Sequence, residues 1–333
     1  MRLKDIYEPM TKNESTILKG IAILMMVFIH TDLSRCQASI EGLRFYELLQ
    51  CLCVPVPLFL IGGGYGLYFV NKHIDKRRYT RILGLYEHFW IILFSFMLIG
   101  CFLKPDRYPG TLADVFLNFS SLHTTWNPEC WFLLPYSILS LSSVYIFRIA
   151  DRFRIRYVLL VAFLVHLVTA FLISRLHVQY MSSSPWLYYS LYLPNMLLCF
   201  LMGAMACRCD FFAKVRGMNK IIVLLLLIAA SLLKIFIQSA VLSPFYAIGI
   251  VISFVVLFDG KECKPLSLLG KHSMNIWLMH TWIFSYLFGR YFYSLGHPIL
   301  IMLVLLIVCI LLSYIVDWIH KKLSIIEQNL FKL

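Results

Sequence analysis

The sequence predicts an all-α, polytopic membrane protein with about ten transmembrane helices and both termini in the cytoplasm. Hydrophobic residues make up 60% of the 333 residues and charged residues only 14%, whereas soluble domains carry about 25% charged residues. Apolar runs long enough to cross a bilayer recur along the whole chain. Short basic clusters separate these runs, as is typical of cytoplasmic loops. We therefore expect one transmembrane domain over residues 1–333.

The first predicted span covers residues 15–33 and follows a basic tail, with Asn13 or Ser15 as the helix cap. No small-residue cleavage site follows the span, which argues against a removed signal peptide. Lys19 and His30 are eleven positions apart, so they lie within about 20° of each other around a helix and about 16 Å apart along it.

Ionisable residues at membrane depth usually face the interior of a helix bundle or a wet cavity. Lys19 and His30 are therefore candidates for a functional pair. A histidine suits proton transfer near neutral pH. Two structural alternatives remain open: Lys19 can extend to the lipid headgroups, and His30 can bond a backbone carbonyl at the helix end.

The second predicted span, residues 43–70, contains two prolines within Cys53–Pro57 and a glycine-rich segment after them. Either a broken helix lining a cavity or a kinked, closely packed helix fits this pattern. The densest basic cluster follows at Asn71–Arg81. Its Arg78 and Arg81 share a helix face and can hold phosphates on the cytoplasmic side, although basic inner loops also arise from topology alone.

The remaining spans are predicted from apolar runs bounded by prolines, glycines and charges. A long outer loop occupies residues 104–128, and the chain ends in an amphipathic segment at the inner surface, 320–333. The predicted spans are residues 82–103, 129–147, 157–174, 187–207, 221–238, 244–258, 267–288 and 298–318.

The distribution of basic residues supports this topology. Of the 30 Lys and Arg residues, two lie within spans, 22 in inner segments and six in outer segments, where Lys271 and Arg44 near the ends of their spans are counted as inner and outer respectively. Since cytoplasmic loops carry the excess of Lys and Arg, this ratio places both termini inside. The net charge of +13 is therefore a topology signal, and we expect no nucleic-acid partner.

The ten cysteines predict neither a disulfide framework nor a metal site. Most lie within apolar runs, where cysteine behaves as a small hydrophobic residue. Cys51/Cys53 and Cys207/Cys209 lack companion histidines at ligand spacing.

Two later segments hold candidate contacts for an acceptor substrate. Trp126, Glu129 and Trp131 stand at the outer entrance of the fourth span, where aromatic residues beside a carboxylate suit sugars, but where tryptophan also serves as an interface anchor. Asn275 and His280 lie within the ninth span and do not share a helix face. His280 is as consistent with an interhelical hydrogen bond as with a site.

Several of these segments together resemble the acyltransferase 3 family of integral membrane acyltransferases. The resemblance covers nearly the whole chain and depends on the order of its motifs. These are Lys19 and His30 within the first span, the glycine-containing Val56–Leu67, the R-x-x-R element Arg78–Arg81, Trp131–Leu133, and Leu269–Ser273 continuing to His280.

The resemblance implies an enzyme that moves an acyl group, acetyl by default, from cytoplasmic acyl-CoA to a sugar hydroxyl outside the membrane. It implies that His30 is catalytic and that Lys19, Arg78 and Arg81 contact acetyl-CoA, with no permanently bound cofactor. The family more often has arginine at the position of Lys19, and lysine gives a point charge instead of a bidentate fork.

The expected acceptor is a surface polysaccharide or its lipid-linked oligosaccharide precursor, because the chain shows no appended hydrolase-like domain. The expected location is the bacterial cytoplasmic membrane, in contact with membrane lipid. A transporter or flippase of lipid-linked saccharides is the alternative. Transporters often have matching broken helices in two repeated halves, but Pro55, Pro57 and Pro194 of this chain do not occupy corresponding positions. No sequence feature favours a scaffold or sensor.

Overall fold

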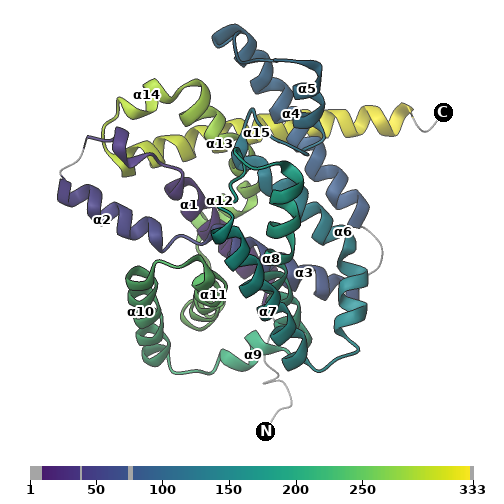
Figure 1. Ribbon diagram of the computed structural model, residues 1–333, viewed down its shortest axis with the longest axis vertical. Coiled ribbons are helices and arrows are strands. Elements are labelled where there is room, and N and C mark those ends of the chain that lie inside the picture. The colour runs from purple at the N-terminus through teal and green to yellow at the C-terminus, as the bar shows by residue number, and fades with distance from the viewer. Residues whose placement is uncertain (1–9, 38–39, 74–77, 331–333) are drawn as a thin grey trace. The chain divides into compact units, whose positions relative to one another are not determined.

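The computed structural model consists of helices joined by short segments, and the residues that it describes, 10–37, 40–73 and 78–330, contain no strand (Figure 1). The all-α prediction is thereby confirmed. The longer helices are α1 (Lys12–Ile29), α2 (Ile40–Cys51), α3 (Pro55–His73), α4 (Arg78–Leu103), α6 (Leu133–Ala150), α7 (Ile155–Arg175), α8 (Pro185–Arg208), α10 (Lys220–Ile237), α11 (Ser243–Phe258) and α15 (Pro298–Leu330).

Among the described residues, eight helical segments are long and apolar enough to cross a membrane. The other two predicted spans correspond to α1 and to the region of α12 (Lys264–Lys271) and α13 (Ser273–Thr281). α1 carries Lys12, Glu14 and Lys19 along 18 residues, and the second region is divided into shorter helices. The chain is a multi-pass membrane protein, and the orientation of its termini stays a prediction.

The chain forms two compact units. Unit 1 comprises residues 1–26, 48–76 and 135–271, and unit 2 comprises residues 27–47, 77–134 and 272–333.

Unit 1 is organised around the crossing of α3 with α8, and α7 packs on α8. A Cβ atom at Gly64 would collide with the backbone of Phe200, and one at Gly203 would collide with the backbone of Ile61. Small residues thus let the two helix backbones touch, as is common in membrane helix pairs. The break at Cys53–Pro57 is confirmed, because α2 ends at Cys51 and α3 begins at Pro55.

The start of α1 is held within unit 1 by a buried carboxylate. Glu14, whose side chain is 0% exposed, forms a bidentate ion pair with Arg216 at 2.7 and 2.8 Å. The N–H of Gly260 also donates to Glu14. The predicted cap at Asn13 or Ser15 is wrong: Thr11 and Glu14 form a reciprocal capping pair, because the sequence Thr-x-x-Glu satisfies two backbone N–H groups at once.

Unit 2 is organised around α13, which packs on α4 and α15. The predicted span 267–288 is interrupted at His272, which caps α13, and continues as a π-helical turn at Trp282–Leu287. The predicted helix end near residue 318 is wrong, since α15 runs unbroken to Leu330, and the location of residues 320–333 at the inner surface stays a prediction. No glycine or proline follows Pro298, so nothing in the sequence ends the helix.

Three short helices lie outside the predicted spans. They are α5 (Leu112–Phe119) in the long outer loop, α9 (Phe211–Val215) and α14 (Gly289–Tyr293). Each is too short to cross a membrane, so hydropathy alone gave no sign of them. α5 begins with a capping box between Thr111 and Asp114.

Candidate functional site

His30 and His280, which were predicted from different spans, lie in direct contact within unit 2. His30 follows the last residue of α1, and its Nδ1 lies 3.0 Å from Nε2 of His280 on α13. Their ring centroids are 5.1 Å apart. His280 is completely buried and His30 is half-buried. The first and ninth predicted spans therefore supply one imidazole pair.

The backbone around His280 determines which nitrogen of each ring carries hydrogen. His280 Nδ1 lies 3.1 Å from the carbonyl oxygen of Ile276 and 2.8 Å from that of Trp277. Carbonyl oxygens only accept, so Nδ1 of His280 is the protonated nitrogen and, in the neutral ring, Nε2 accepts. His30 Nδ1 must then donate to it. The unprotonated nitrogen of neutral His30 is Nε2, the atom able to take a proton or attack a carbonyl carbon.

The same helix also gathers groups from the segment before α6. The indole N–H of Trp277 donates to the backbone oxygen of Glu129 at 3.1 Å, and the Glu129 carboxylate accepts from the hydroxyl of Tyr286 at 2.7 Å. Asn127 accepts from Thr281 at 2.7 Å and donates to a backbone carbonyl of α13. Glu129 thus contacts Trp277 of α13 and Tyr286 of the π-helical turn, which lie on either side of His280 in the chain.

The two predicted tryptophans have different surroundings. Trp126 is buried and packs its ring edge-on against Tyr108 and Phe119, and its backbone N–H donates a hydrogen bond to Asn118 Oδ1. Trp131 is half-buried and contacts Phe132. Trp131 is therefore the more accessible of the two aromatic candidates.

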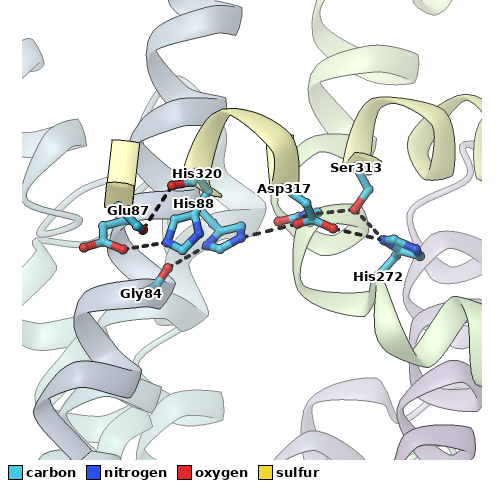
Figure 2. Close-up of polar contacts among 9 residues, drawn as sticks. Gly84, Glu87, His88, His272, Ser313, Asp317 and His320 are labelled. Atoms are coloured by element: carbon cyan, nitrogen blue, oxygen red, sulfur yellow. Dashed lines mark hydrogen bonds and ion pairs between the residues drawn. The ribbon is translucent and has the colours of Figure 1, made fainter. Parts of the chain in front are cut away.

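A second polar cluster in unit 2 joins α4, α13 and α15 (Figure 2). Asp317 lies 3.4 Å from His88 Nε2 and 3.6 Å from His272 Nδ1. His320 bonds Glu87 at 2.6 Å and stacks on His88 with 4.0 Å between the ring centroids. Since His88 Nδ1 donates to the carbonyl of Gly84 at 2.7 Å, both of its nitrogens face acceptors.

Asn275 belongs to this second cluster. Its side-chain amide N–H groups donate to Ser313 and to Asp317, each at 2.8 Å. Within the described part of the chain, the Asn275 Oδ1 atom is buried without a hydrogen-bond partner. The prediction that Asn275 and His280 occupy different faces is confirmed, because one faces Asp317 and the other faces His30.

Sequence reasoning missed the side chains around Asp317. Glu87, His88 and Asp317 lie within predicted spans and His320 just after the last one, and ionisable residues at such positions are by themselves a signal for a functional or structural polar site in a membrane protein. The charge count did not use them, because it considered only Lys and Arg.

The three residues predicted to contact the acyl donor lie in the first halves of α1 and α4. Lys19 is exposed in the first half of α1, within unit 1. Arg78 and Arg81 lie in the first turn of α4, within unit 2, where Arg78 is half-buried and Arg81 exposed. The rest of the predicted basic cluster, residues 74–77, lies outside the described residues.

The described residues offer no group of three histidine, cysteine or acidic side chains arranged to hold a metal ion. All ten cysteines are described, and all are free thiols.

Comparison with protein families gives one match. The acyltransferase 3 model, described as an acyltransferase domain, matches residues 13–318, which is nearly the whole chain. Searches of curated proteins and of solved structures found no match.

Proposed function

Because the chain belongs to the acyltransferase 3 family and is thus a multi-pass membrane acyltransferase, we propose that it is an O-acetyltransferase of the bacterial cytoplasmic membrane. Its donor is acetyl-CoA on the cytoplasmic side. Its acceptor is a hydroxyl of an extracytoplasmic surface polysaccharide or of the lipid-linked precursor. The observation that carries the proposal is the His30–His280 pair at 3.0 Å.

In this mechanism His30 is the general base. Its Nε2 takes the proton of the acceptor hydroxyl while the hydroxyl oxygen attacks the thioester carbonyl carbon. The new C–O ester bond forms as the C–S bond breaks, and the proton passes from His30 to the departing sulfur to give the CoA thiol. His280 acts through His30: it holds the ring in the tautomer that leaves Nε2 basic.

The geometry also supports a second chemical route. An unprotonated Nε2 can attack the thioester itself and carry the acetyl group to the acceptor as an acyl-imidazole. Trapping of a labelled acetyl group on His30 after mixing with donor alone distinguishes the two routes. We favour the base route, because it requires only one imidazole with an unprotonated Nε2, and the contact with His280 fixes that tautomer in His30.

The substrate contacts extend this proposal to the predicted residues. Lys19, Arg78 and Arg81 hold the donor, since cations suit phosphate groups. Glu129 and Trp131, which are half-buried, contact the acceptor sugar, as a carboxylate and an aromatic face can. The buried Trp126 and Asn275 support the surrounding structure.

The test is acetyl transfer by the purified chain in lipid nanodiscs with labelled acetyl-CoA and the host's surface glycan. We expect His30→Ala to abolish transfer without reducing the amount of folded protein. His177→Ala, which changes an exposed histidine in another segment, is the matched control and should keep full activity. Full activity in His30→Ala would refute the proposed mechanism, and a glycan whose acetylation is unchanged in a gene deletion would refute the acceptor.

A further inference from the structure

Unit 1 contains a cavity that the proposed catalytic residues do not use. It has a volume of about 670 Å³ and lies between the first turns of α1 and the whole length of α12. Ligand sites for small molecules and cofactors typically measure about 300–1,000 Å³. The space is therefore large enough for a nucleotide-sized ligand and larger than a single phosphate needs.

The walls of this cavity are strongly basic. α12 contributes Lys264, Ser267 and Lys271, which its helical spacing places on one face, and α1 contributes Lys12. Glu262 is the one acidic residue in the lining. All three lysines are exposed, so their ammonium groups are available to a ligand from solution.

Polar groups between the lysines complete the lining. Asn13 and Thr16 face the cavity from α1, and the Ser267 hydroxyl donates to Asn13 at 3.3 Å. Hydroxyl and amide groups can donate to phosphate oxygens, and lysine provides three N–H donors with a full charge. The set of side chains thus matches an anion with several oxygen acceptors.

The two walls are held together by backbone contact. A Cβ atom at Gly20 would collide with the carbonyl of Leu266, and one at Gly270 would collide with the carbonyl of Thr16. The backbones of α1 and α12 therefore touch at these two places, which sets the spacing between Lys12 and the lysines of α12. A preorganised site of this kind loses little entropy when a ligand binds.

The cavity face of α1 continues toward a predicted donor contact. Lys12, Thr16 and Lys19 are spaced four and three residues apart, so they lie along one side of the helix. Lys19 lies about one turn beyond Thr16. Lys19 therefore continues the basic side of α1 beyond the cavity.

We propose that this cavity binds the phosphates of the acyl donor, in the form of the 3′-phosphorylated adenosine diphosphate end of CoA. The inference rests on the proposed function, which makes acyl-CoA the donor, and adds Lys12, Lys264 and Lys271 to its binding residues. CoA carries a 3′-phosphate apart from its diphosphate, so cations at more than one place can contribute. An anionic lipid headgroup offers the same phosphate chemistry and is the source that the experiment must separate.

The experiment measures binding to the full chain in nanodiscs by calorimetry. The probes are CoA, adenosine 3′,5′-bisphosphate and pantetheine, which has no phosphate. In the triple variant Lys12→Gln, Lys264→Gln, Lys271→Gln we expect the Kd of the first two probes to rise about tenfold or more, since each loses charge-assisted contacts. The Kd of pantetheine should not change.

A matched variant controls for net charge. Lys214→Gln, Lys220→Gln, Lys261→Gln removes three exposed lysines of the same unit that do not line the cavity, and it should keep wild-type affinities. Ser267→Asp tests the site without removing a lysine, and it should weaken CoA binding because it places a carboxylate beside the phosphates. Unchanged CoA affinity in both the lysine triple variant and Ser267→Asp overturns the proposal.

The remaining outcomes identify the ligand source and separate this inference from the proposed function. Loss of bound phosphatidylglycerol in native mass spectrometry of the triple variant, with unchanged affinity for adenosine 3′,5′-bisphosphate, would assign the cavity to lipid and overturn the nucleotide assignment. Wild-type protein that transfers acetyl groups, while both the triple variant and Ser267→Asp bind CoA normally, refutes the phosphate site alone. Wild-type protein that neither binds CoA nor transfers acetyl groups refutes the proposed function.

Discussion

Replacing His280 by phenylalanine tests whether the hydrogen bond between the two histidines contributes to catalysis. Phenylalanine keeps a ring of similar size in a fully buried position, next to Phe284, on which the His280 ring stacks at 6.1 Å. It removes the Nε2 acceptor for His30 Nδ1 at 3.0 Å. This bond then no longer fixes the tautomer of His30, and in the other tautomer Nε2 carries hydrogen and cannot act as a base.

The size of the effect follows from the hydrogen bond that is lost. A neutral hydrogen bond contributes about 0.5–1.5 kcal/mol net. Each 1.36 kcal/mol in the activation free energy changes the rate tenfold, so kcat should fall by about 2- to 13-fold. The KM for acetyl-CoA should not change, because the bond orients the base and does not hold the donor.

The assay is steady-state acetyl transfer by the purified variants in nanodiscs, with thermal unfolding measured in parallel. His280→Gln is the matched variant, because its side-chain oxygen can accept the hydrogen of His30 Nδ1, and it should recover most of the lost kcat. A phenylalanine variant with wild-type kcat would refute the positioning role. So would a glutamine variant that is as slow as the phenylalanine variant at equal stability.

Three further predictions concern stability. Glu14→Ala should lower the free energy of unfolding by about 3–5 kcal/mol, because it leaves the Arg216 guanidinium without its buried carboxylate. In denaturant titrations, the double variant Glu14→Ala, Arg216→Ala should lose less free energy of unfolding than the sum of the two single variants, and strict additivity would contradict this coupling. Gly203→Val should lower the melting temperature, because its side chain would enter the backbone of α3. Gly62→Val should lower the melting temperature far less, because a Cβ atom at Gly62 meets nothing within 4 Å. Equal falls in melting temperature would be evidence against close contact of α3 with α8. Hydrogen bonds from the Thr111 side chain and backbone lower the pKa of Asp114. The contribution of Asp114 to stability is therefore complete above the ordinary aspartate pKa and is lost as pH falls through the lowered value. Protease resistance of residues 104–128 should decline in acid for wild type but not for Asp114→Asn, and equal acid sensitivity of the two proteins would contradict the assignment.

Local features of the fold could be predicted from the sequence because they depend on neighbouring residues. The break before Pro55, the helix start near Arg78 and the long apolar spans each follow from proline chemistry, charge and hydropathy over a few turns. The predicted cap of α1 at Asn13 or Ser15 was wrong because each residue was considered alone. The cap that forms depends on a pair of residues, Thr11 and Glu14, whose side chains each accept from the other's backbone N–H. The unbroken α15 was missed because a change from apolar to amphipathic character does not end a helix.

The candidate site could be predicted only in part, because its contacts connect distant parts of the chain. Lys19 and His30 were selected from one helix face, but nothing in the sequence indicates that His30 meets His280, 250 residues later. His280 was considered as an interhelical hydrogen-bond partner, which is the contact that the structure shows. The cluster around Asp317 combines residues from three helices, so single-helix periodicity could not assemble it.

The length of α15 has a practical consequence for experiments on orientation. Its 33 residues correspond to about 50 Å of helix, whereas the hydrocarbon core of a bilayer is about 30 Å thick. Roughly 20 Å of continuous helix therefore extends beyond the lipid tails. A fluorescent protein fused to the C-terminus would be held clear of the headgroups by a stiff stalk, so that quenchers added to one compartment would report directly on the side to which this end of the chain projects.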